Sequence, residues 1–240
     1  MPFRRLPASD AAINDALRAI YAKVQDAAPE SLPVSAETLA RVNDMYPKFN
    51  KEVGERGAAL SVQSDATKKK YAAADICKTY VSQFIQVFNF GITRGRYNVS
   101  ERGYYQLDIN QETVPDLSSE SNILTAAENI IKGDKARVAA GGAEMINPSA
   151  EEVEEKYKIL MDAIKEQSDD KDIYEKEQRD VDNLRAEALE TVKDVWDEIE
   201  FNLRKNKPSV MRRKAREYGV VYALRPGEPE EEPPVEEETT

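Results

Sequence analysis

The sequence contains no histidine and only one cysteine, Cys77, among its 240 residues. Without histidine, the chain lacks the base of Ser-His and Cys-His nucleophile pairs and a ligand of the Glu-x-x-His di-iron sites that helical bundles often house. Zinc sites that need Cys or His ligands are excluded for the same reason. Cys77 cannot form an internal disulfide, and its position on an apolar stripe predicts a small buried thiol.

Long apolar runs are also absent. No stretch of 18 or more apolar residues is present, so we expect neither a membrane-spanning helix nor a membrane partner. The first 20 residues lack the continuous apolar segment of a secretory signal, and we expect a cytoplasmic protein. The net charge of −11 means that the average surface repels nucleic acid and anionic membranes at long range.

What the sequence does contain is helical periodicity, with apolar residues three or four apart along most of the chain. Because period-two alternation is nearly absent, the sequence predicts an all-α protein of helical bundles. The helices are expected over residues 10–28, from 36 through the kinking Pro47, and over 59–93, 100–105, 119–140, 150–165, 181–203 and 209–218. The strongest apolar stripe comprises Tyr71, Ala74, Cys77, Val81, Phe84, Phe88 and Ile92.

Two further local patterns mark the second half of the chain. Ser149 and Glu152 have the spacing of a capping box and predict a helix start. The charged stretch 166–182 has almost no apolar spacing, so we predict a turn or an exposed helix end there.

The two halves of the chain match each other at a shift of 114 residues. This shift places Ser35 on Ser149, and it pairs identical residues such as Val81 with Val195 and Ile85 with Ile199. Chance similarity between two amphipathic halves is the alternative. We therefore predict two similar helical-bundle units related by internal duplication, over residues 1–115 and 116–225, followed by a disordered acidic tail over 226–240.

The most concentrated charge lies in residues 203–225, which carry a local charge of +7. The cations are Arg204, Lys205, Lys207, Arg212, Arg213, Lys214, Arg216 and Arg225, against one acid, Glu217. Such a cluster suits the phosphates of nucleic acid or an acidic partner. The alternative is a solvated helix end, where cations are favourable in any case.

The tail that follows carries seven glutamates. Three interpretations are open: a solubilising disordered end, a segment that folds back on the basic residues, or a segment that docks on the basic residues of another subunit.

Four aromatic residues lie off the main stripe: Phe90, Tyr97, Tyr104 and Tyr105. We interpret them as a docking surface, because aromatic anchors are typical of interfaces. Stacking on bases beside Arg94 and Arg96 is the alternative.

No pattern for catalysis, a cofactor or a metal is present. The Gly141-Gly142 pair lacks the strand-loop-helix context of a phosphate cradle, and the acidic residues show no fixed spacing to a base. We therefore expect a non-enzymatic structural or protein-interaction protein that self-assembles or binds a protein partner. The alternatives are a nucleic-acid-associated module that uses residues 203–225 and is modulated by the acidic tail, and, third, an enzyme that works through Asp and Glu alone.

Overall fold

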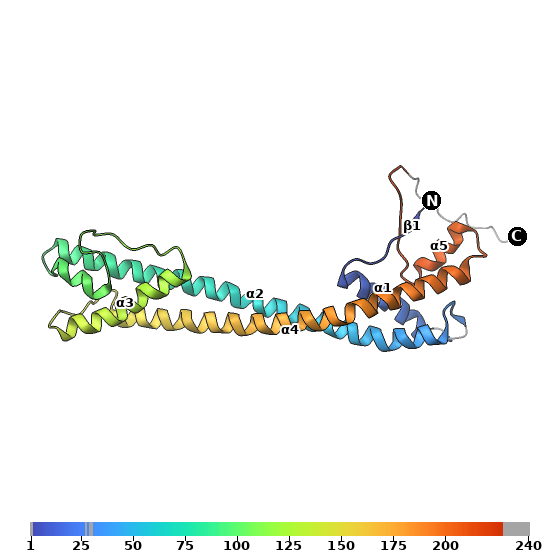
Figure 1. The fold of residues 1–240 in the computed structure, drawn as a ribbon, viewed down its shortest axis with the longest axis horizontal. Helices are drawn as coiled ribbons and strands as arrows, with labels where there is room; N and C mark the ends of the chain where they lie inside the picture. Colours follow the sequence, from blue (N-terminus) through green and yellow to red (C-terminus); the bar gives the residue numbers. More distant parts are fainter. Residues whose placement is uncertain (1, 27, 29–30, 228–240) are drawn as a thin grey trace. The chain divides into compact units, whose positions relative to one another are not determined.

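The computed structural model describes residues 2–26, 28 and 31–227, and the chain is mostly helical, as the periodicity predicted. Figure 1 shows the arrangement of the elements along the chain. In order, they are β1 (Phe3–Arg4), α1 (Asp10–Asp26), α2 (Ala36–Thr93), the 3-10 helix η2 (Val99–Tyr105), α3 (Glu120–Ala139), α4 (Ala150–Leu203), α5 (Pro208–Arg216) and β2 (Tyr222–Ala223).

Two of the helices are far longer than predicted. α2 has 58 residues and α4 has 54, so the predicted separation within 36–93 and the predicted turn or helix end at 166–182 are both wrong. The charged stretch contains no glycine or proline, and good helix formers need no apolar neighbour to continue a helix. An ion pair between Lys176 and Asp180, four residues apart, supports it locally. Pro47 lies inside α2.

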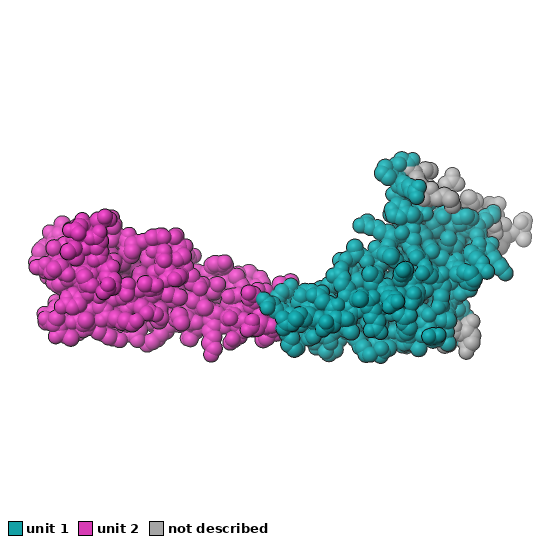
Figure 2. Space-filling view, in the orientation of Figure 1, with its two compact units in different colours: residues 1–59, 174–240 teal, residues 60–173 magenta. Residues whose placement is uncertain are grey.

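The chain forms two compact units, which Figure 2 shows in different colours. Unit 1 comprises residues 1–59 and 174–240, and unit 2 comprises residues 60–173. This division differs from the predicted one at residue 115, because α2 and α4 each run through both units without a break. Each unit therefore takes segments from both halves of the sequence.

The core of unit 1 joins four helical segments. It contains residues from α1, the first part of α2, the last part of α4, and α5, among them Ile13, Leu17, Val42, Phe49, Val195, Trp196, Ile199 and Ala215. Glu198 of α4 accepts hydrogen bonds from the Ser35 backbone N–H (2.5 Å) and the Thr38 hydroxyl (2.6 Å) at the start of α2. β1 and β2 pair antiparallel, with Arg4 opposite Tyr222.

The core of unit 2 also joins four helical segments. It contains residues from the later part of α2, η2, α3, and the first part of α4, among them Val81, Phe84, Phe88, Tyr105, Ile123, Ala127, Ile130, Val153 and Leu160. Cys77 is buried in this core, which confirms the prediction for its thiol. Most of the predicted stripe is buried or half-buried, but Tyr71 is 64% exposed and does not belong to it.

The start of α4 has the predicted capping box. The Ser149 N–H donates to the Glu152 carboxylate (2.8 Å), and the Glu152 N–H donates to the Ser149 hydroxyl oxygen (3.2 Å). These bonds satisfy donors that a helix start otherwise leaves without partners.

Two remaining expectations concern the membrane and the tail. Within the described part of the chain, no helix combines the length and apolar character needed to cross a membrane. The predicted disordered tail falls, from residue 228 onward, outside the described residues.

Candidate functional site

The predicted basic segment runs from the end of α4 through α5 to just beyond β2, in unit 1. Its exposed cations are Arg204, Lys205, Lys207, Arg213, Lys214, Arg216 and Arg225. The guanidinium carbon of Arg204 lies 3.6 Å from the ring centroid of Phe201, and that of Arg216 lies 5.5 Å from the ring centroid of Tyr222. Most of the predicted cluster thus faces solvent.

Arg212 is the exception. Its side chain is buried, which corrects the prediction that it belongs to an exposed cluster. α5 packs on the core of unit 1 through Ala215, and Arg212 lies three residues earlier on the same face of the helix.

The four aromatic residues of the predicted docking surface do not form one surface. Phe90 is 58% exposed and Tyr104 is 39% exposed. Tyr97 is half-buried and stacks on Phe88, with ring centroids 5.0 Å apart. Tyr105 is fully buried, so its assignment to a docking surface is wrong.

Tyr105 belongs instead to a buried polar cluster in unit 2. Its hydroxyl donates to Asp134 (2.7 Å) and accepts from Nε–H of Arg137 (2.6 Å). Burial and the bond to Asp134 raise the pKa of Tyr105. Arg137 also donates to the carbonyl of Ala143 (2.6 Å). Because these bonds pair the buried charges of Arg137 and Asp134, we assign this cluster to stability.

A second buried arginine, Arg102, holds the irregular segment that follows η2. Its guanidinium donates to the carbonyls of Asp108 (2.6 Å) and Gln111 (2.6 Å) and to the side chain of Asn89. The sequence offered no signal for this role, since the backbone carbonyls of a loop meet a distant side chain only in the folded chain.

One face of α2 in unit 2 exposes three large apolar side chains. They are Ile76 (49% exposed), Val87 (39%) and Phe90 (58%). At 3.6 residues per turn, these positions fall within roughly 60° of one another around the helix axis. We refer to these three residues as the apolar face of α2.

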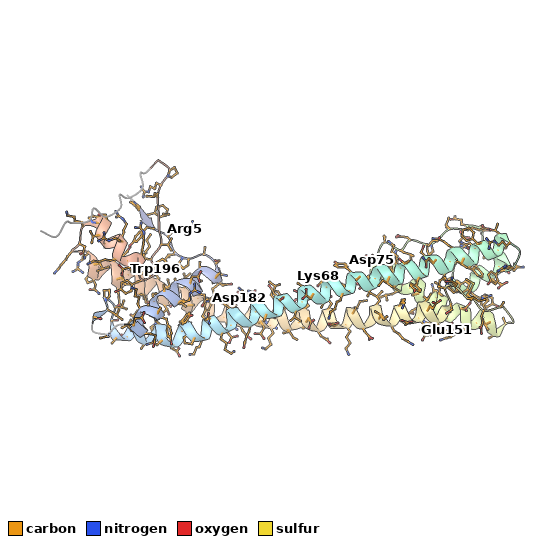
Figure 3. The ribbon with its side chains drawn as sticks, turned by 180° about the vertical axis from the view of Figure 1, so that it is seen from behind. Arg5, Lys68, Asp75, Glu151, Asp182 and Trp196 are labelled. Carbon is orange, nitrogen blue, oxygen red and sulfur yellow. The ribbon has the colours of Figure 1, made fainter. Side chains whose placement is uncertain are left out.

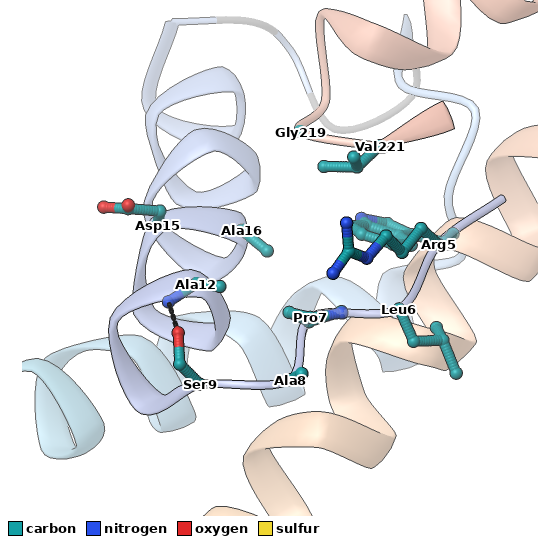
Figure 4. A pocket seen from close by; sticks show the side chains of 11 residues that line it. Arg5, Leu6, Pro7, Ala8, Ser9, Ala12, Asp15, Ala16, Gly219 and Val221 are labelled. Carbon is teal, nitrogen blue, oxygen red and sulfur yellow. Dashed lines mark hydrogen bonds between the residues drawn. The ribbon is translucent and has the colours of Figure 1, made fainter. Parts of the chain in front are cut away.

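A pocket of about 630 Å³ opens in unit 1 (Figure 4). Four segments line it: the residues between β1 and α1, the first turns of α1, Trp196 of α4, and the turn after α5. Figure 4 shows the Arg5 side chain extending toward α1, where Ala12 and Ala16 lie. The lining residues are Arg5, Leu6, Pro7, Ala8, Ser9, Ala12, Asp15, Ala16, Trp196, Gly219 and Val221.

Two side chains that line this pocket carry donors without a recorded side-chain acceptor. Among the described residues, the Arg5 guanidinium makes no ion pair, and the buried Nε1–H of Trp196 has no hydrogen-bond acceptor. Arg5 and Trp196, both labelled in Figure 3, belong to unit 1. The one acidic side chain of the lining, Asp15, pairs with Arg18 (2.7 Å). Sequence reasoning missed this site because its parts are far apart in the chain.

A smaller pocket of about 260 Å³ lies in unit 2, at matching positions of the sequence. It is lined by Asn122, Ala126, Asn129 and Ile130, which follow Ala8, Ala12, Asp15 and Ala16 by 114 residues. Where the larger pocket has Ala16, the smaller one has the bulkier Ile130.

Three carboxylates of unit 1 lie close together: Glu52, Glu177 and Asp180 each place an oxygen within 4.8 Å of the others. Lys51 neutralises Glu52 (3.0 Å), and Lys176 contacts both Glu177 (2.9 Å) and Asp180 (3.4 Å). The two ammonium groups therefore offset part of the negative charge of the three carboxylates.

Comparisons with known proteins found no family model that matches the chain, and no match among curated proteins or solved structures.

Proposed function

We propose that the protein is a non-enzymatic interaction protein that associates with a second copy of itself through the apolar face of α2. The observation that carries this proposal is the exposure of Ile76, Val87 and Phe90 on one side of a single helix. Burying large apolar side chains of this kind is the main driving force of protein association.

A second copy is the partner that this face fits best. Two identical helical stripes complement each other across a twofold axis, which yields a closed dimer. The alternation of four- and three-residue steps through Ile76, Tyr80, Gln83, Val87 and Phe90 is the spacing used when helices pair side by side.

The matching face of α4 does not offer a second surface of this kind. A shift of 114 residues places Glu190 at the position of Ile76, Phe201 at that of Val87, and Arg204 at that of Phe90. Because the charged side chains oppose apolar association, we expect one such interface per chain and a dimer rather than a longer assembly.

Internal duplication is part of the same proposal. The helix bounds support it: α2 begins at Ala36 and α4 at Ala150, which is the shift found in the sequence. Burial supports it as well, since Val81 and Val195 are both buried, and so are Ile85 and Ile199. In this view each repeat contributes one short helix, one long helix and one terminal helix. Each compact unit then contains helical segments from both repeats.

Size-exclusion chromatography with light scattering tests the self-association. The full chain and a form that ends at residue 225 are measured at two concentrations, and we expect a dimer for both. Phe90→Glu should give a monomer, whereas Tyr71→Glu should remain dimeric. Tyr71 is a suitable control because it is 64% exposed and points to a different side of the same helix. A monomeric wild-type chain at both concentrations would contradict the proposal.

A second candidate function is binding of nucleic acid by the basic segment, supported by its exposed cations such as Arg213 and Lys214. The form that ends at residue 225 should then bind labelled DNA or RNA at low salt and release it as salt rises. Absence of binding at low salt would eliminate this candidate.

A further inference from the structure

We propose that the pocket of unit 1 binds a small amphipathic carboxylic acid, with its carboxylate at Arg5 and Trp196 and its apolar part along α1. This site is separate from the apolar face of α2 and does not depend on self-association.

The first argument is the set of donors without acceptors. Trp196 is fully buried, and a buried N–H without an acceptor carries a free-energy cost that folded proteins usually avoid. The guanidinium of Arg5 is a second donor, and among the residues that the structure describes it has no carboxylate partner. A ligand carboxylate provides acceptors for both groups and the opposite charge for Arg5.

The second argument is the surrounding lining. Most of the other side chains are small or apolar, among them Leu6, Pro7, Ala12, Ala16 and Val221. A volume of about 630 Å³ lies in the range of pockets that hold small organic molecules, and such pockets combine an apolar wall with a few polar groups. A short aliphatic chain attached to the carboxylate suits this wall.

The third argument comes from the matching pocket of unit 2. At the position of Ala16 it has Ile130, and at the position of Trp196 the sequence has Ser82. At the position of Gly219, whose φ is 83°, the smaller pocket has the large side chain of Tyr105. Small residues thus keep the pocket of unit 1 wide, and an indole donor is added to it, while larger side chains narrow its counterpart.

Binding can be read directly, because Trp196 is the only tryptophan of the chain. The full-length protein is titrated with octanoate while tryptophan fluorescence and heat of binding are recorded. We expect a saturable change in both signals. Octanamide, which has the same chain without the negative charge, should bind at least about tenfold more weakly.

Three variants locate the site. Arg5→Gln should weaken octanoate binding by about tenfold or more, because the charge-assisted bond is lost. Ala12→Met should weaken it by filling the pocket from α1. Arg94→Gln, which removes another exposed arginine, in unit 2, should leave octanoate binding unchanged. Circular dichroism shows whether each variant is folded. If Ala12→Met does not fold, the comparison of wild type with Arg5→Gln still tests the proposal.

The proposal would be overturned by the absence of a saturable signal at octanoate concentrations up to about 10 mM, which corresponds to very weak binding. Equal affinities of wild type and Arg5→Gln would overturn it as well. These outcomes are independent of the oligomeric state, so they leave the proposed self-association untouched.

Discussion

Nε–H of Arg137 donates a hydrogen bond of 2.6 Å to the hydroxyl oxygen of Tyr105, and both side chains are buried in unit 2. The same hydroxyl donates to Asp134 (2.7 Å), which also pairs with Arg137 (2.9 Å). A buried tyrosine, which the sequence predicted to lie on a docking surface, thus bridges a buried arginine and a buried aspartate. Closed groups of this kind are stable only when every member keeps its partners.

Tyr105→Phe should therefore destabilise the protein by about 1–3 kcal/mol, since it leaves Arg137 and Asp134 each short of one hydrogen bond. Arg137→Met should cost more, about 3–5 kcal/mol, because it leaves the buried Asp134 without its counterion. Urea unfolding followed by circular dichroism measures both. If Arg94→Met, at an exposed position, costs as much as Arg137→Met, the cluster has no special role in stability.

Substitution by alanine should have opposite effects on stability at two helical glycines, because their surroundings differ. A Cβ at Gly133 of α3 would lie 2.3 Å from the backbone oxygen of Tyr104, whereas a Cβ at Gly57 of α2 would meet nothing within 4 Å. Gly133→Ala should destabilise by about 1–3 kcal/mol through the forced shift of backbone. Gly57→Ala should stabilise by about 0.5–1 kcal/mol, because alanine is the better helix former. Thermal unfolding of the two variants checks the contrast, and a stabilising Gly133→Ala would contradict it.

The buried thiol of Cys77 predicts a loss of stability at alkaline pH. Burial raises the pKa of Cys77 to about 11, above its ordinary value near 9. The folded chain therefore holds this proton more tightly than the unfolded chain does. The stabilisation that follows from this tighter proton binding is complete below about pH 9 and is lost as the pH rises through 11, with a total of about 3 kcal/mol.

The measurement is the free energy of unfolding of wild type and Cys77→Ala between pH 8 and pH 11. Tyr105 and Tyr222 also have raised pKa values and act in the same direction, so both proteins should lose stability. The wild type should lose more, and parallel curves for the two proteins would show that Cys77 does not contribute.

The division into compact units predicts how fragments behave. Residues 1–115 and 116–225 each lack half of both cores, because Leu17 packs in one core with Val195 and Val81 packs in the other with Val153. Neither fragment should be a folded monomer, whereas co-expression should give a folded one-to-one complex. Light scattering and thermal unfolding of the fragments test this. A cooperatively unfolding monomer of either fragment alone would contradict it.

Local features of the fold were predictable because they depend on neighbours in the chain. The spacing of Val81, Phe84 and Phe88 identified a buried helical stripe, and the pair Ser149 and Glu152 identified a helix start. The same reasoning failed at residues 166–182, where it took the absence of apolar spacing for a turn or an exposed helix end, although α4 continues through them. A helix that is polar at nearly every position still closes its backbone hydrogen bonds.

The candidate sites were less accessible to sequence reasoning. The basic segment was recognised from composition, but the burial of Arg212 depends on which face of α5 meets the core of unit 1. The exposed Phe90 and the buried Tyr105 looked alike in the sequence. Whether an aromatic side chain is an anchor or part of the core is decided by what packs over it.

The sequence by itself determined the helical class, the buried thiol, the capping of α4 and the absence of histidine-dependent chemistry, since each follows from composition or from residues a few positions apart. Only the tertiary structure decided that α2 and α4 continue through both units. It also brought Ser35 to Glu198, 163 positions away in the chain. It also decided that Arg5 and Trp196 share a pocket. Such contacts join distant segments, and their free energy depends on packing that no local spacing encodes.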